Sequence, residues 1–149
     1  MESSSQGPTP AVVRQNATAI SSVDLNRLSE LAWSARENAY VIGPTKVGCS
    51  ILCEDGSVFI GCNVEHRYRC HDVHAEVNAI TNMVASGYAS PIVAVFVAAE
   101  RSRFTPCGGC MDWIMQFARD SSCLILSQSK REGEILTLSA HEMMPYYPE

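Results

Sequence analysis

One continuous apolar run constrains the fold more than any other feature of the sequence. Residues 91–99, PIVAVFVAA, carry no charge and are rich in Val, which is typical of a strand covered on both faces. Patterns of helical spacing stand on either side of this run, at about 74–86 and 107–119. A helix, a buried strand and a helix in this order indicate a sheet with helices packed on its two faces.

The rest of the chain continues the alternation of helices and strands. Asp55-Gly56 stands between two β-rich runs, and this dipeptide is a strong hairpin signal. The sequence therefore predicts one α/β domain, a three-layer α/β/α sandwich with a mixed five-stranded sheet. The further elements are a helix from Ser21 or Ser22 that ends before Gly43-Pro44, strands at about 46–53, 57–64, 122–126 and 134–138, and a helical turn before Pro145.

Composition limits the domain count, the partners and the compartment. The chain has 149 residues, enough for one domain, and we expect residues 1–20 to be a flexible arm and 21–149 the folded part. A net charge of −5 argues against a nucleic-acid partner.

No apolar run approaches the roughly 20 residues that span a membrane, and the amino terminus lacks the features of a signal peptide. Seven cysteines, an odd number, fit metal binding or burial in a cytoplasmic protein better than disulfides.

Two short motifs carry groups that suit a metal ion. His74-Ala75-Glu76 and Pro106-Cys107-Gly108-Gly109-Cys110 both stand where a helix is expected to begin. Cys107 and Cys110 are three residues apart and face the same way in a first turn, where the helix dipole favours their thiolate forms. With His74 they supply three ligands for Zn²⁺, which leaves a fourth position for water. Glu76 is then expected beside that water as a proton carrier.

The combination of H-x-E and P-C-x-x-C is a described signature of zinc deaminases. From about Leu25 to Tyr147 the chain resembles the small, single-domain cytidine deaminases. This resemblance implies zinc-dependent hydrolytic deamination of a cytosine nucleoside to the uracil form, with release of ammonia. It also implies a homo-oligomer, usually a homotetramer with sites at subunit boundaries.

The resemblance assigns further residues to the substrate. It implies that Asn63 and Glu65 of the motif Gly61-Cys62-Asn63-Val64-Glu65 hold the ribose 3'-hydroxyl, whereas the residues alone also fit a polar strand end facing solvent. The resemblance further implies that the backbone around Ala75 meets the base carbonyl, that the Thr105 carbonyl faces the leaving amine, and that Tyr146 or Tyr147 closes the site.

The chain departs from the family pattern at three places. His74 stands where the small enzymes commonly use a cysteine, with Val77 replacing an arginine that would offset a third thiolate. Thr45 stands where the family usually offers a phenylalanine to the pyrimidine, so base stacking must come from elsewhere. Arg67, Tyr68 and Arg69 follow Glu65, where the family carries small neutral residues; the two arginines fit either an anionic substrate group or acids of a neighbouring subunit.

Three other functions stay open from the sequence. The substrate could be a cytosine nucleoside antibiotic such as blasticidin S, since its deaminases belong to the same superfamily. The chain could also be a non-enzymatic zinc-binding module in which Cys70 or His71 completes the metal shell. The third alternative is a deaminase of polynucleotides, against which the acidic net charge counts.

Overall fold

The computed structural model describes residues 20–148, which form a mixed five-stranded sheet with helices on both faces. The proposed arm at residues 1–20 lies, apart from Ile20, outside the described residues. The strand order is β2-β1-β3-β4-β5. β3 and β4 pair in parallel, whereas every other neighbouring pair is antiparallel. The strands are β1 (Val47–Cys53), β2 (Val58–Cys62), β3 (Ile92–Ala99), β4 (Leu124–Gln128) and β5 (Ile135–Ser139).

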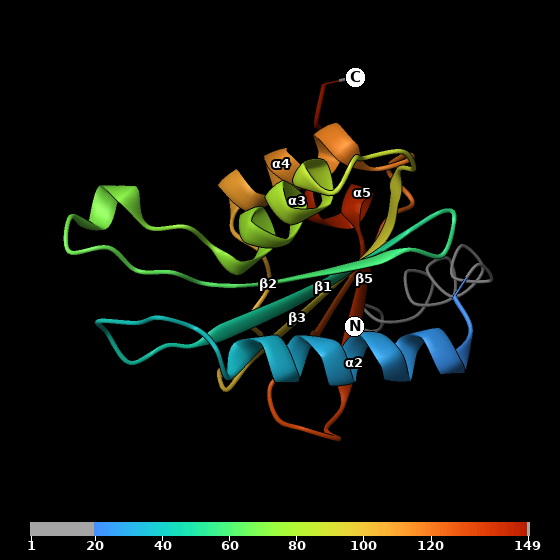
Figure 1. Cartoon of the computed structure of the whole chain (residues 1–149). Coiled ribbons are helices and arrows are strands. Elements are labelled where there is room, and N and C mark those ends of the chain that lie inside the picture. Colours follow the sequence, from blue (N-terminus) through green and yellow to red (C-terminus); the bar gives the residue numbers. More distant parts are fainter. Residues whose placement is uncertain (1–19, 149) are drawn as a thin grey trace, which may run out of the picture.

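The helices form the two outer layers (Figure 1). α2 (Ser22–Arg36) covers one face of the sheet, and α3 (Ala75–Ala85), α4 (Gly108–Phe117) and α5 (Ala140–Met143) lie on the other. A single 3₁₀ turn, η2 (Arg69–His71), lies in the segment between β2 and α3, which projects from the body of the molecule. The predicted three-layer sandwich is therefore confirmed. No helix among the described residues has the length and apolar character needed to cross a membrane.

The apolar run at 91–99 forms the buried centre of the sheet. Every residue of β3 is buried, and its side chains alternate between two cores. Val95 packs with α3 and α4, whereas its neighbour Phe96 packs with α2. This two-residue alternation is what a pleated strand produces when both faces are covered, and it confirms the expectation from the sequence.

The first helix ends well before Gly43-Pro44, as the sequence predicted. The Ser21 side chain caps it by accepting a hydrogen bond from the Asp24 N–H at 3.0 Å, and the helix ends at Arg36. Beyond it, the Tyr40 N–H donates to the Asn63 carbonyl at 3.1 Å, and the Glu65 N–H donates to the Tyr40 carbonyl at 2.7 Å. The chain before β1 is thereby held beside the end of β2, where it forms one wall of a cavity.

The helix α3 is joined closely to the edge strand β2. The Asn78 side chain accepts from the Cys62 N–H at 3.0 Å, and the Asn82 side chain donates to the Ile60 carbonyl at 2.8 Å. These two contacts lie one helical turn apart. They therefore fix the position of α3 along its axis and its rotation about that axis. The first residues of α3 consequently lie at the end of β2.

Candidate active site

Both motifs meet where one set of strand ends lies. β1 begins at this end of the sheet, and its antiparallel neighbours end there, with Gly48 paired to Cys62 and Val47 paired to Ala99. α3 and α4 also begin at this end. His74 is the residue that caps α3, and Cys107 is the residue that caps α4. The predicted placement of both motifs at helix starts is confirmed.

Three side chains at these helix starts form a potential metal site. The candidate ligand atoms of His74, Cys107 and Cys110 all lie within 4.8 Å of one another. The His74 Nδ1 atom is 3.3 Å from the Cys110 sulfur and 3.6 Å from the Cys107 sulfur. Tetrahedral zinc, with its usual bonds to nitrogen and sulfur, separates those two ligand atoms by about 3.6 Å. Both nitrogen–sulfur distances are therefore close to the separation that a shared zinc ion requires.

The chemistry of the donor set also fits zinc. Burial raises the pKa of the Cys110 thiol well above its ordinary value, and the nearby Glu76 and Cys107 raise it further. Such a group becomes a thiolate when a divalent cation offsets its charge. Two sulfurs and one imidazole are a ligand set typical of zinc, and three protein ligands are the number found in catalytic sites, which leave a fourth position open.

Neither alternative fourth ligand belongs to this cluster. Cys70 and His71 lie exposed in η2, on the projecting segment, and are not among the grouped donors of the described residues. The three-donor arrangement therefore matches an open site better than a closed, purely structural one.

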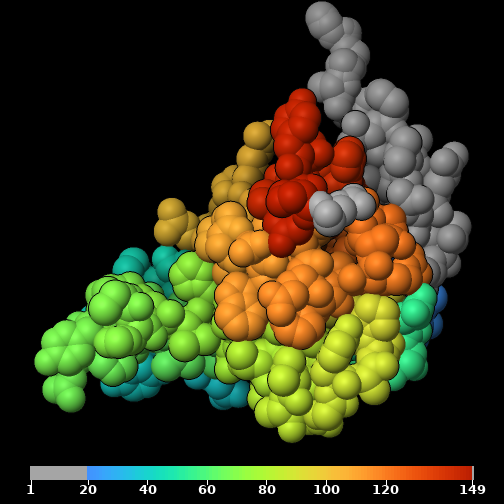
Figure 2. All heavy atoms as spheres, turned by 90° about the horizontal axis from the view of Figure 1, so that it is seen from above, coloured from blue at the N-terminus to red at the C-terminus, as the bar shows by residue number. Residues whose placement is uncertain are grey.

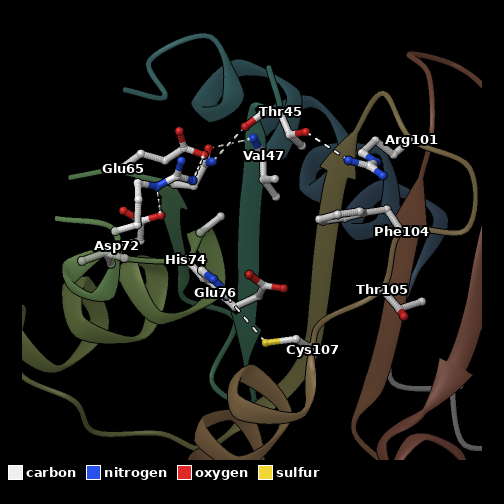
Figure 3. Close-up of a pocket in the computed structure, with 14 residues that line it drawn as sticks. Thr45, Val47, Glu65, Asp72, His74, Glu76, Arg101, Phe104, Thr105 and Cys107 are labelled. Carbon is white, nitrogen blue, oxygen red and sulfur yellow. Dashed lines mark hydrogen bonds and ion pairs between the residues drawn. The ribbon is translucent and has the colours of Figure 1, made fainter. Parts of the chain in front are cut away.

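The Glu76 carboxyl is buried in the first turn of α3, with only 4% of the residue exposed. It lines the same cavity as His74 and Cys107 (Figure 3). Burial raises the pKa of Glu76, and the hydrogen bond with its own backbone, the nearby His74 and the Cys110 side chain oppose this increase in part. A carboxyl group in such surroundings can hold a proton nearer to neutral pH than an exposed one, which suits general acid and base catalysis.

A cavity of about 350 Å³ opens in front of these groups, which is large enough for a small ligand. The structure brings most of the predicted substrate residues to its wall. The predicted residues that line it, besides His74, Glu76 and Cys107, are Asn63, Glu65, Arg69, Ala75 and Thr105.

Asn63 joins the cavity wall to the start of β1. Its Oδ1 atom accepts from the Val47 N–H at 2.8 Å, and its amide nitrogen donates to the Thr45 carbonyl at 3.0 Å. Only 8% of Asn63 is exposed. Asn63 is thus a buried, hydrogen-bonded part of the wall, whereas the alternative from the sequence was a polar strand end in solvent.

Glu65 is held in a comparable way. Its Oε1 atom accepts from the Ile42 N–H at 2.7 Å and the Gly43 N–H at 2.8 Å, and its Oε2 atom lies 3.2 Å from the Arg69 guanidinium. The N–H groups of Gly43 and Ile42, followed by the charge of Arg69, lower the pKa of Glu65 despite some loss of solvation. The carboxyl group is therefore kept ionised on the cavity wall.

Three predicted substrate residues do not line the cavity within one chain. The Arg67 guanidinium lies over the ring of Tyr68, 5.6 Å from its centre, on the projecting segment. Tyr68 is 62% exposed. The Tyr147 hydroxyl donates to the Asp112 carboxylate on α4, where the C-terminal segment lies against that helix (Figure 2). Contact of these three residues with substrate stays a prediction.

Sequence reasoning missed several residues of the wall, including three whose side chains carry charge or an aromatic ring. Asp72, Arg101 and Phe104 line the cavity, and Phe104 is partly buried against the core. Phe104 directly precedes Thr105, and this position next to the second motif is the one signal that could have identified it. Arg101 and Asp72 lie in irregular segments, where no periodic pattern shows which way a side chain points.

Comparisons with known proteins agree with the fold and the site. Residues 22–126, which include all three candidate metal ligands, match the family model of the cytidine and deoxycytidylate deaminase zinc-binding region. The chain is 31% identical over 124 residues to a cytidine deaminase of Sporosarcina psychrophila, covering 83% of this chain and 90% of the relative. A cytidine deaminase of Halalkalibacterium halodurans is 27% identical over 83% of this chain and 92% of its own length.

Solved structures with the same name share the architecture. The cytidine deaminase of Burkholderia pseudomallei superimposes with a TM-score of 0.71 at 30% identity, over 81% of this chain and 96% of that one. The cytidine deaminase of Mycobacterium tuberculosis gives a TM-score of 0.69 at 25% identity, over 83% of this chain and 95% of that one. With its three metal donors, its buried glutamate and these relatives, the chain belongs to the cytidine and deoxycytidylate deaminase family, a family of zinc-binding hydrolytic deaminases.

Proposed function

We propose that this chain removes the exocyclic amino group of a cytosine nucleoside by zinc-dependent hydrolysis, giving the uracil form and ammonia. One observation carries the proposal. Three potential zinc donors lie together at the starts of two helices, and two of them, His74 and Cys107, line one cavity with the buried Glu76. The relatives that match over most of this chain are named cytidine deaminases.

The proposed reaction replaces the C4 amino group with oxygen from water. Zinc bound by His74, Cys107 and Cys110 would supply a water made nucleophilic near neutral pH. Glu76 takes a proton from this water and gives it to the ring nitrogen N3. A second proton passes through the same carboxyl to the departing amine, so that one water is consumed and one ammonia is released.

The cavity wall supports a specific pose of the base. We propose that the backbone around Ala75 meets the base carbonyl and that the Thr105 carbonyl faces the leaving amine, because both residues line the cavity beside the metal donors. Phe104 also lines it and is partly buried. It offers an aromatic surface to the pyrimidine ring, a role that Thr45 does not fill.

We further propose that Asn63 and Glu65 bind a ribose hydroxyl. Each already uses part of its hydrogen-bonding capacity to hold residues 42–47 in place. The Asn63 amide has a second N–H, and the Glu65 Oε2 atom contacts only the Arg69 side chain in the described part of the chain. The free Asn63 N–H can donate one hydrogen bond to a hydroxyl on the substrate, and the Glu65 Oε2 atom can accept one from it.

Neither the antibiotic deaminase nor the non-enzymatic zinc module is favoured. The matching relatives bear the name cytidine deaminase, with no antibiotic in it, and the cavity residues described above suit a nucleoside. A closed zinc module would need a fourth protein donor, whereas Cys70 and His71 stand apart from the three-donor group.

We propose that the active form is a homotetramer. Exposed Tyr68 on the projecting segment, and Tyr147 outside the cavity, support an assembly in which these side chains reach the site of a neighbouring copy. Size-exclusion chromatography coupled to light scattering should give four times the mass of one chain. A monomer with full activity would refute this assembly.

We also propose that residues 21–149 form the deaminase domain and that it works in the cytoplasm. The family match begins at residue 22, and all seven cysteines are free thiols, which suits a reducing compartment. Deletion of residues 1–20 should leave zinc content and the unfolding temperature unchanged, and cell fractionation should recover the chain with cytoplasmic markers. Loss of zinc in the truncated chain, or recovery outside the cytoplasm, would contradict this proposal.

The direct test is the variant Glu76→Gln. It should keep one zinc per chain and lose ammonia release from cytidine by at least about 100-fold, the scale of a positioned acid–base group. Glu30→Gln, which removes an exposed carboxylate on α2, is the matched control and should keep both properties. Substantial ammonia release by the Glu76→Gln variant would refute the proposed proton transfer.

A further inference from the structure

The cavity wall contains two arginines whose surroundings differ. The Arg69 guanidinium lies 3.2 Å from the Glu65 carboxylate and 2.8 Å from the Asp72 carboxylate. Arg101 instead donates to the Thr45 hydroxyl at 3.2 Å, and within residues 20–148 it forms no ion pair. A guanidinium has five N–H donors. Arg101 thus brings to the cavity a positive charge that no carboxylate of the described chain offsets.

The loop between β3 and α4 holds Arg101 at the cavity. The preceding Glu100 pairs with the Arg36 guanidinium at 3.0 Å, and the Arg101 N–H donates to the Ala99 carbonyl at 2.7 Å. Arg103 has a φ of 54°, a backbone conformation that is unfavourable for residues other than glycine and that tends to occur at functional sites. This turn separates Arg101 from Phe104, and both side chains line the cavity.

Arg101 stands at the sugar end of the cavity in the proposed pose. Figure 3 shows Glu65 and Arg101 on opposite sides of Thr45, with all three far from the floor formed by Glu76 and Cys107. A cytosine ring with its C4 at this floor directs its sugar toward Thr45. One side of the sugar then faces Glu65, and the other side faces Arg101.

We infer that Arg101 selects a cytosine substrate with an anionic group, a phosphate or a carboxylate, on its sugar. This inference rests on the proposed function and deepens it. The planar guanidinium matches either anion in a two-point contact. The sequence pointed instead to Arg67 and Arg69 for such a contact, but Arg67 does not line the cavity and Arg69 is already shared by two carboxylates.

The test compares three substrates: cytidine, cytidine 5'-monophosphate and cytidine 5'-carboxylate. The measured quantity is the ratio of kcat/KM for each anionic compound to that for cytidine. In the unaltered enzyme this ratio should be at least about 10 for one of the two anions, and Arg101→Gln should lower it by about 10- to 100-fold, as expected for a charged hydrogen bond. Arg101→Lys keeps the charge without the planar guanidinium group. Its ratio should lie between those of the unaltered enzyme and the Arg101→Gln variant.

Arg103→Gln is the matched control, because it removes the same charge from the same loop at a residue that does not line the cavity. It should change the ratio by less than about threefold, since a solvent-exposed charge is screened. A preference for the phosphate or for the carboxylate identifies which anion the enzyme recognises. The inference would be overturned if this ratio is near one in the unaltered enzyme, or if Arg101→Gln leaves the ratio unchanged. In either case, turnover of cytidine would still support the proposed function.

A binding measurement separates the two proposals. Dissociation constants for the three compounds are measured by calorimetry on zinc-loaded Glu76→Gln protein, with and without Arg101→Gln. Tighter binding of an anionic compound that Arg101→Gln abolishes supports the inference, and equal affinities contradict it. No ammonia from any of the three compounds with the unaltered enzyme would refute the proposed function, and these affinities would still decide the role of Arg101.

Discussion

Gly61 in β2 lies directly against Ala79 in α3: a Cβ atom added to Gly61 would fall 2.3 Å from the Ala79 backbone nitrogen and 2.6 Å from the Ala75 carbonyl oxygen. The strand and the helix that opens with His74 therefore touch through their backbones. A glycine is required here by space, since its φ is not positive. This contact sets the distance between the strand β2 and the helix α3, and so the position of the metal donor His74.

Gly61→Ala should push α3 away from β2. We expect a loss of about 1–3 kcal/mol or more in the free energy of unfolding, together with weaker zinc binding, because His74 moves with the helix. Chemical unfolding and metal analysis measure the two effects. Gly108→Ala, where nothing lies within 4 Å of the added atom, is the control and should stay close to the parent protein. Parent-like stability and zinc content in Gly61→Ala would contradict the contact.

Phe104 should contribute an aromatic face to substrate binding. Phe104→Leu keeps an apolar side chain but removes the ring, and we expect kcat/KM for cytidine to fall by about 2- to 12-fold, as for the loss of an aromatic pair. Phe104→Tyr should restore most of the value. Equal kcat/KM for the Leu and Tyr variants would show that the ring itself plays no part.

Glu65 should make stability depend on pH. Its pKa in the folded chain is lowered from the ordinary 4.5, chiefly by the N–H groups of Gly43 and Ile42. The stabilisation from the charged form is therefore fully present above pH 4.5 and disappears as the pH falls through the lowered pKa. Glu65→Gln should be less stable than the parent at pH 7, and the difference should shrink toward pH 3. Unfolding curves across this range test it, and a gap that is constant with pH would count against it.

A buried hydrogen bond should stabilise the α2 layer. The Trp33 Nε1 atom donates to the Gln128 side chain at 2.7 Å, and both residues are buried. Gln128→Leu leaves the indole N–H without this partner, so we expect a loss of about 1–3 kcal/mol. Gln116→Leu, at an exposed position of α4, should change stability by less than about 0.5 kcal/mol. Similar midpoints of urea unfolding for the two variants would refute the assignment.

Local sequence signals predicted the elements and the metal donors well. The Val-rich run at 91–99 forms a strand covered on both faces, and His74 and Cys107 stand at helix starts. Both features depend on short-range physics, namely two-residue alternation and the first turn of a helix. Gly61 also had a recognisable place in a motif, although its physical reason, the contact with α3, became visible only in the structure.

Features that depend on distant contacts were less predictable. Ile80 and Val84 are both apolar and one helical turn apart in α3, yet Ile80 is buried whereas Val84 is 47% exposed. The buried face of the helix includes Glu76 instead. Arg101 reaches the cavity only because the loop after β3 folds back toward Thr45. No spacing within the sequence encodes that approach.

The central claim is that His74, Cys107 and Cys110 bind one zinc ion and leave a position open for a reactive water. X-ray absorption on the purified protein, with metal content and ammonia release measured on the same sample, tests it most directly. We predict one zinc per chain with two sulfur and two nitrogen or oxygen neighbours, and activity that is lost on chelation and recovered with zinc. A metal-free sample with full activity, or a zinc shell closed by a third sulfur, would contradict the account.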